Sequence, residues 1–144
     1  MTMTAKPAYA DPRALLQLLP FVRELGISIV SAEPGTVVVE MPYAERFSTP
    51  PNHFPASIVG TLGDVAAVSS CTSKLPSGWA GATLDYTVKM TAPALGEKLL
   101  ARGRVLQAGQ TTSVGAADIF AVSGGSEVLC GTVLATARNF QLKE

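Results

Sequence analysis

Residues 55–73 read PASIVGTLGDVAAVSSCTS, and the rest of the chain is organised around this stretch. It is long enough for a helix, and its side chains are small or apolar except for one carboxylate, Asp64. A helix that is apolar on every side is normally buried. A buried carboxylate is unfavourable unless it is paired, hydrogen-bonded or used in chemistry. We therefore predict a central buried helix with Asp64 as its candidate functional group.

One side of this predicted helix carries almost no side-chain bulk. Four small residues follow one another at spacings of three or four and share one face; they are Ala56, Gly60, Gly63 and Ala67. A glycine inside a helix is less favourable than alanine by about 1 kcal/mol. Close approach of another backbone is the usual compensation, so we expect a curved sheet to pack tightly against this face.

The segments on both sides of the helix predict mostly strands. Before it, two apolar runs flank the turn sequence Glu33-Pro34-Gly35 and predict a hairpin over 27–33 and 36–42. A polar, proline-rich loop at 43–54 leads into the helix. After the helix, alternating apolar and polar residues predict four antiparallel strands, near 79–91, 97–108, 110–122 and 127–139.

The N-terminal region predicts a loose tail over 1–10, followed by short helices. Asp11 can cap a helix that has Pro12 in its first position, and Pro20 interrupts that helix. A further turn over 21–25 is closed by Gly26. The whole chain, 1–144, is thus predicted to be one α+β domain in which a long helix packs on about six strands.

The composition excludes several classes of function. The formal net charge is zero and no run of Lys or Arg occurs, which argues against nucleic-acid binding. The N-terminus lacks the apolar core of a signal peptide, and no stretch is apolar enough to span a membrane. Hydrophobic residues make up 47% of the chain and charged residues 15%, so we expect apolar surface to be buried between subunits.

Cys71 and Cys130 are the two cysteines, and both lie in apolar runs without the spacing of metal ligands. We interpret them as reduced core thiols of a cytoplasmic protein. No metal site is predicted.

Three stretches of the chain have the order and spacing of a known family. FPASIVGTLGDVAAVSS resembles a helix-start motif, TLDYTVKMTAPALGEKLLARG resembles two strands joined by a Pro-Ala bend, and VLQAGQTTSVGAADIFAVSGGSEVLCGTVLATARNF resembles a last pair of strands. The family is the hotdog-fold thioesterase superfamily, and the chain most resembles its PaaI-like acyl-CoA thioesterases. The resemblance covers roughly residues 20–140. It implies a curved antiparallel sheet around one long helix, in a homodimer or dimer of dimers with joined sheets.

The resemblance implies hydrolysis of an acyl-CoA thioester to a free acid and CoA. The free N–H groups at the helix start would polarise the thioester carbonyl, through the amide of Ala56 or alternatively of Ser57. Asp64 would act either as a general base on water or as a nucleophile, and both roles stay open. CoA enters only as part of the substrate, so no cofactor is expected.

Further site residues are implied by the same resemblance. Thr83 matches a hydroxyl residue that the partner subunit places beside the acid to orient water. Asn52 loosely matches a residue that holds substrate or water, and His53, the only histidine, is either a substrate contact or a loop or dimer contact. The histidine of the family's helix-start motif falls at Pro55. Candidates for binding the CoA phosphates are Lys89, Arg102 and Arg104.

Other interpretations of these residues stay open. Asp64 could be a structural acid, and Asp85, two residues after Thr83, could be a competing acid on the same strand face. The protein could be a non-catalytic dimer that binds acyl-CoA. It could also be a dehydratase or hydratase of acyl thioesters, but that chemistry usually pairs a histidine with the acid, and Pro55 occupies the histidine position.

Overall fold

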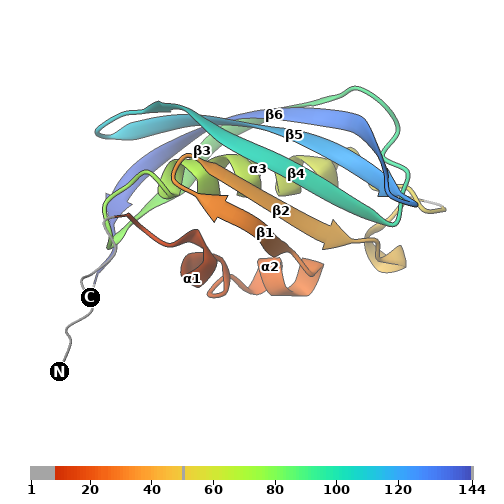
Figure 1. The fold of residues 1–144 in the computed structure, drawn as a ribbon, viewed down its shortest axis with the longest axis horizontal. Helices are drawn as coiled ribbons and strands as arrows, with labels where there is room; N and C mark the ends of the chain where they lie inside the picture. Colours follow the sequence, from red (N-terminus) through yellow and green to blue (C-terminus); the bar gives the residue numbers. More distant parts are fainter. Residues whose placement is uncertain (1–8, 50, 144) are drawn as a thin grey trace.

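The computed structural model of the chain describes residues 9–49 and 51–143, and its centre is one long helix inside a curved sheet (Figure 1). The predicted α+β hotdog fold is confirmed, and the bounds of the long helix and the strands agree with the predicted ones to within two residues. The helices are α1 (Pro12–Leu16), α2 (Pro20–Leu25), the short 3-10 helix η1 (Glu45–Phe47) and α3 (Ala56–Thr72). The strands are β1 (Ser28–Glu33), β2 (Thr36–Pro42), β3 (Trp79–Met90), β4 (Lys98–Ala108), β5 (Thr112–Ser123) and β6 (Ser126–Gln141).

All strands belong to one antiparallel sheet with the order β1-β2-β4-β5-β6-β3. The chain therefore crosses from β2, which lies next to the edge strand β1, through α3 to β3 at the opposite edge of the sheet. β3 pairs with β6 on one side only, and its outer side is an edge of the sheet. Six consecutive residues of this edge strand, from 82 to 87, are exposed.

Small residues on both surfaces let α3 and the sheet approach closely. A Cβ added at Gly63 would lie 2.9 Å from Ile119 Cδ1, and it would also meet Val133. From the sheet side, Gly103 of β4 faces the backbone carbonyl of Ala66. Such contacts leave no room for a larger side chain. They confirm the prediction that the sheet packs tightly against the helix face that carries small residues.

Hydroxyl groups near the end of α3 bond to the β1–β2 hairpin. The backbone N–H of Val37 donates to Ser70 Oγ at 3.0 Å, and that of Gly35 donates to Ser73 Oγ at 2.9 Å. Both serines are buried. These bonds satisfy polar groups that would otherwise be unfavourable in the core, and they fix the hairpin against the helix.

The N-terminal helices form as predicted, but part of the predicted tail does not. Asp11 Oδ1 accepts a hydrogen bond from the backbone N–H of Arg13, and Gly26 ends α2 with a φ of 73°. Residues 1–8 of the tail lie outside the described residues. Ala10 is buried and its N–H donates to the carbonyl of Leu75 at 2.9 Å, so the loose-tail prediction is wrong at this residue.

Cys71 and Cys130 are both free and buried, which confirms that they are core thiols. In residues 9–49 and 51–143, no helix is long and apolar enough to cross a membrane.

Candidate active site

The fold brings Asp64 and Thr83 into direct contact. Thr83 Oγ1 donates a hydrogen bond to Asp64 Oδ1 at 2.9 Å, although the two residues are 19 positions apart. β3 runs back along α3 after the turn that follows the helix, as the bond from the Gly81 N–H to Thr72 Oγ1 at 3.0 Å also shows. The candidate acid and the candidate hydroxyl therefore form one cluster.

Burial shifts the pKa of the acid in this cluster. Desolvation raises the pKa of Asp64 above its ordinary value of 3.8, and the hydrogen bond from Thr83 opposes part of that rise. A carboxylate with a raised pKa is a stronger base than an exposed one, which suits proton abstraction from water.

The origin of Thr83 differs from the expectation. The resemblance implied that this hydroxyl comes from the partner subunit, whereas Thr83 of the same chain contacts Asp64. The reason is the topology: β3 follows α3 and returns antiparallel beside it. That part of the expectation was wrong.

Asp85 is not a competing acid on the face of Thr83. A β-bulge shifts the register between them, so that Thr83 lies opposite Ala137 and Asp85 lies opposite Thr136. Neighbouring residues of β6 point to opposite faces of the sheet, and directly paired residues share a face. Thr83 and Asp85 therefore point to opposite faces, and the alternation assumed from the sequence fails at the bulge.

The start of α3 offers free backbone donors. Pro55 is its N-cap, in an extended conformation, and the amides of Ile58 and Val59 both donate to the Pro55 carbonyl. Among the described residues, no acceptor lies within bonding distance of the amides of Ala56 and Ser57, and both residues are exposed. These two amides can therefore donate hydrogen bonds to a ligand atom such as a carbonyl oxygen.

Asn52 and His53 lie in the loop before α3, where backbone contacts hold them. The N–H of Asn52 donates to Tyr43 Oη at 3.1 Å, and its φ of 64° places it in a tight turn. His53 Nδ1 lies 2.7 Å from the Pro51 carbonyl. Within the described part of the chain, neither side chain is hydrogen-bonded to Asp64 or Thr83, so the predicted residues form two groups rather than one.

Two of the three candidates for the CoA phosphates are already paired. Arg102 makes two hydrogen bonds to Glu127, at 2.8 and 2.9 Å, and Arg104 lies 3.6 Å from Asp118. Gly103 between them faces α3, so alternation places both arginines on the outer face of the sheet. Lys89 on β3 takes part in no ion pair among the described residues, but it follows Val88, which faces Gly60 of α3, so alternation places Lys89 on the outer face as well.

Asp64 and Thr83 also line a cavity of about 390 Å³ between α3 and the α1–α2 segment, which we call the α1–α3 groove. Its other walls are mostly leucine, valine and phenylalanine side chains. The sequence alone does not connect the leucines of α1 and of the link that follows it with Asp64. The signal was the run ALLQLLPF at 14–21, which is unusually apolar for such short helices.

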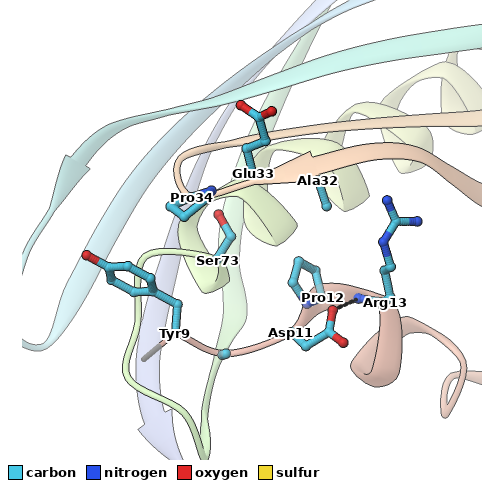
Figure 2. Close-up of a pocket in the computed structure, with 9 residues that line it drawn as sticks. Tyr9, Asp11, Pro12, Arg13, Ala32, Glu33, Pro34 and Ser73 are labelled. Carbon is cyan, nitrogen blue, oxygen red and sulfur yellow. Dashed lines mark hydrogen bonds between the residues drawn. The ribbon is translucent and has the colours of Figure 1, made fainter. Parts of the chain in front are cut away.

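A second cavity, of about 250 Å³, lies where the chain entering α1 meets the tip of the β1–β2 hairpin, as Figure 2 shows. Tyr9, Glu33 and Ser73 line it, together with Asp11, whose carboxylate caps α1. None of the predicted site residues lines this cavity. Among the residues that the structure describes, no group of three or more His, Cys, Asp or Glu side chains is arranged to hold a metal ion.

Comparisons with known proteins agree on one family. A scan against protein-family models finds no match. Acyl-coenzyme A thioesterase 13 of Homo sapiens is 30% identical over 111 residues, which are 74% of this chain and 77% of that protein.

Solved structures share the fold. A thioesterase family protein from Silicibacter pomeroyi superposes with a TM-score of 0.86 at 28% identity, over 90% of this chain and 96% of that one. The PaaI protein of Escherichia coli, from the phenylacetic acid degradation operon, has a TM-score of 0.76 at 20% identity, over 90% and 92% of the two chains. At that identity, the likeness to PaaI concerns the fold. Together with the human relative, these similarities show that the chain belongs to the hotdog-fold thioesterase family.

Proposed function

We propose that this protein hydrolyses acyl-CoA thioesters, with Asp64 as the general base. The observation that carries the proposal is the hydrogen bond from Thr83 Oγ1 to Asp64 Oδ1, in a chain of the thioesterase family. This bond holds one carboxylate oxygen and leaves the other oxygen available for a water molecule. The raised pKa of Asp64 supports the role of a base more than that of a nucleophile.

In the proposed reaction, Asp64 takes a proton from water as the water oxygen attacks the thioester carbonyl carbon. The amide of Ala56 donates to the carbonyl oxygen and stabilises the negative charge that develops there. The C–S bond then breaks, and the proton passes from Asp64 to the CoA sulfur as the thiol leaves. The products are the free acid and CoA, and Asp64 is again ionised.

The proposed site needs two chains because of a distance along α3. Eight residues separate Ala56 from Asp64, which corresponds to about 12 Å at a rise of about 1.5 Å per residue. A carbonyl held at the helix start is therefore out of reach of the Asp64 of the same helix. We propose that the helix start of one chain and the Asp64–Thr83 pair of a second chain form each site.

The edge strand β3 supplies a suitable interface for this homodimer. It presents unpaired backbone groups and exposed apolar side chains, among them Leu84, which is 58% exposed. Gly60 of α3 faces Tyr86 of β3. Because β3 runs antiparallel to α3, the helix start, about one turn before Gly60, lies level with the part of β3 around Lys89. A two-fold axis through β3 near Tyr86 would then bring Ala56 of one chain level with Asp64 of the other, because Gly60 lies midway between Ala56 and Asp64 on α3. The two sheets would join through their β3 strands.

The first test is thiol release from a panel of acyl-CoAs by wild type and Asp64→Asn. We expect Asp64→Asn to lose about 100- to 10,000-fold in rate, the usual contribution of a general base. Binding of acyl-CoA without thiol release would instead show a non-catalytic acyl-CoA-binding dimer. Hydration of an enoyl-CoA without thiol release would indicate a hydratase.

The second test asks whether two chains share each site. Ala56→Pro removes the proposed donor and suits the first position of a helix, and Pro55 already has the extended conformation that a following proline requires. We expect Ala56→Pro and Asp64→Asn each to be inactive alone. Subunits mixed by partial unfolding and refolding should regain up to about a quarter of wild-type activity, because half the dimers are mixed and each has one intact site. No recovery in verified mixed dimers would contradict the shared site.

A further inference from the structure

We propose that the α1–α3 groove holds the acyl chain of the thioester, and that preferred substrates carry an unbranched aliphatic chain of about ten carbons. This inference rests on the proposed function, since it places the thioester at Asp64 and Thr83.

The side chains of the groove match an aliphatic ligand. Leu15, Leu18 and Phe21 come from the α1–α2 segment, and Val65 and Val68 come from α3. Leu18 is 72% exposed, and Phe21 is 45% exposed, so apolar surface here is left in contact with water. Such surface next to a reactive group is typical of a ligand site.

The polar groups of the groove are arranged for a ligand with one reactive end. Asp64 is the only charged residue among the described residues that line it, and it lies with Thr83 at one end. Towards the other end, Thr72 Oγ1 already accepts a hydrogen bond from the N–H of Gly81 at 3.0 Å. An acyl thioester has the matching chemistry, with a polar head for Asp64 and an apolar tail for the leucines and valines.

The length of the groove sets the length of the chain. Asp64 and Thr72 both line it, and eight helical residues span about 12 Å. With C–C bonds of about 1.5 Å in a zigzag, an extended chain advances by about 1.3 Å per carbon, so roughly nine carbons fit. The groove volume of about 390 Å³ also leaves room for a chain of this length.

The test separates acyl-chain binding from catalysis by using two series of ligands. The first series consists of saturated acyl-CoAs from two to sixteen carbons, for which kcat/KM is measured by thiol release. The second consists of S-alkyl-CoA thioethers of the same lengths, which cannot be hydrolysed, and whose Kd is measured by calorimetry. In wild type we expect up to about a fourfold gain in affinity per added methylene, ending near ten carbons.

Two variants change the groove in different ways. Val68→Phe adds a phenyl ring one turn after Asp64, so the best chain length should shorten to about five carbons. The ratio of affinities for the decyl and butyl thioethers should fall at least tenfold. Leu18→Asn alters the exposed rim and should lower the same ratio about threefold or more. Leu106→Asn is the matched control, since Leu106 is 51% exposed on β4 and does not line the groove, and its ratio should equal that of wild type.

The outcomes distinguish the two proposals. A Kd for thioethers that does not depend on chain length, or that Val68→Phe and Leu18→Asn leave unchanged, overturns the acyl-chain proposal even when thiol is released normally. A rising affinity with chain length, without thiol release from any acyl-CoA, upholds the groove and overturns the proposed catalysis. If Leu18→Asn weakens self-association but leaves the length dependence intact, the groove is an interface between copies, and the acyl-chain proposal fails.

Discussion

Asp64 is the only acidic or basic residue of α3, and its surroundings explain its energetic disadvantage and support its proposed role as a base. Burial disfavours its charged form, while one hydrogen bond from Thr83 favours it. Functional residues commonly show such a conflict between stability and activity. Two predictions concern the balance between these two influences.

Removing the Thr83 hydroxyl should shift the pH dependence of hydrolysis. Activity should rise with pH as Asp64 ionises, and loss of the hydrogen bond removes an influence that lowers its pKa. In Thr83→Ala, the acid limb of kcat/KM should therefore move to higher pH, and the plateau should fall by up to about 100-fold as the carboxylate loses its orientation. Thr83→Ser keeps the hydroxyl and should keep the wild-type limb. A limb that stays in place or moves to lower pH would contradict the role of Thr83.

Asp64→Asn should make the protein more stable at neutral pH. The folded protein holds the Asp64 proton more tightly than the unfolded chain does, so the contribution of Asp64 to stability falls as pH rises through its raised pKa. Asn removes the buried charge and can still accept the Thr83 hydrogen bond. We expect a gain near the lower end of about 0.5–2 kcal/mol at pH 7, measured by urea unfolding, because the carboxylate is only partly buried.

The gain from Asp64→Asn should disappear below the ordinary carboxylate pKa of 3.8, where both states are protonated. Asp85→Asn, which changes an exposed carboxylate, is the control. Equal stability of wild type and Asp64→Asn at pH 7 would disprove the energetic conflict.

At the scale of the elements, α3 fits the sheet because glycines in both surfaces let backbones approach. The two glycines of the helix itself are not equivalent, however. Gly63 faces the centre of the sheet, while Gly60 faces the ring of Tyr86 on the edge strand β3. The space around each glycine, rather than its helix propensity, should decide the effect of a larger residue.

Gly63→Ala should destabilise the protein by about 1–3 kcal/mol, because the new methyl group meets Ile119 and Val133. Helix propensity alone would predict a gain of about 1 kcal/mol. Gly60→Ala is the matched comparison: its methyl group would lie 3.0 Å from Tyr86 Cε2, and this edge-strand ring can shift. Its effect should lie within about 1 kcal/mol of zero. Urea unfolding that ranks the two variants in the opposite order would refute this account of the packing.

At the scale of the whole molecule, the proposed homodimer accounts for both the open edge of β3 and the separation along α3. An exposed edge strand that has no proline and few charged residues tends to pair with another strand. The sequence of β3, WAGATLDYTVKM, has its two charged residues at positions 85 and 89 and no proline. Self-association through this strand would complete the sheet and the proposed site in one step.

A single cysteine on β3 can test the proposed two-fold axis. In Tyr86→Cys, the two new thiols would face each other across an antiparallel strand pair, within the Cα separation of about 4.4–6.8 Å that a disulfide spans. Mild oxidation should therefore give a covalent dimer on a non-reducing gel, with little background because Cys71 and Cys130 are buried. Ser123→Cys, at the exposed end of β5, should stay uncross-linked. A protein that sediments as a monomer, or a dimer that Tyr86→Cys cannot cross-link, would rule out this interface.

The sequence by itself determined the elements and their order. The apolar stretch around Asp64 could only be a buried helix, and the Pro and Gly residues marked where the strands and short helices begin and end. Asp64 was identifiable for the same local reason, since it is the one charge in an otherwise apolar helix. Thr83 was found through the family resemblance, although its own chain rather than a partner supplies the contact.

Only the tertiary structure decided what these residues contact. The register shift between Thr83 and Asp85 depends on pairing with β6, so strand alternation alone assigned Asp85 to the wrong face. The α1–α3 groove likewise joins leucines of α1 and of the link that follows it to Asp64, which lies far from them in the sequence. Local propensity and hydrophobic period act over a few residues, whereas a cavity wall and a strand register depend on segments that meet only when the chain folds.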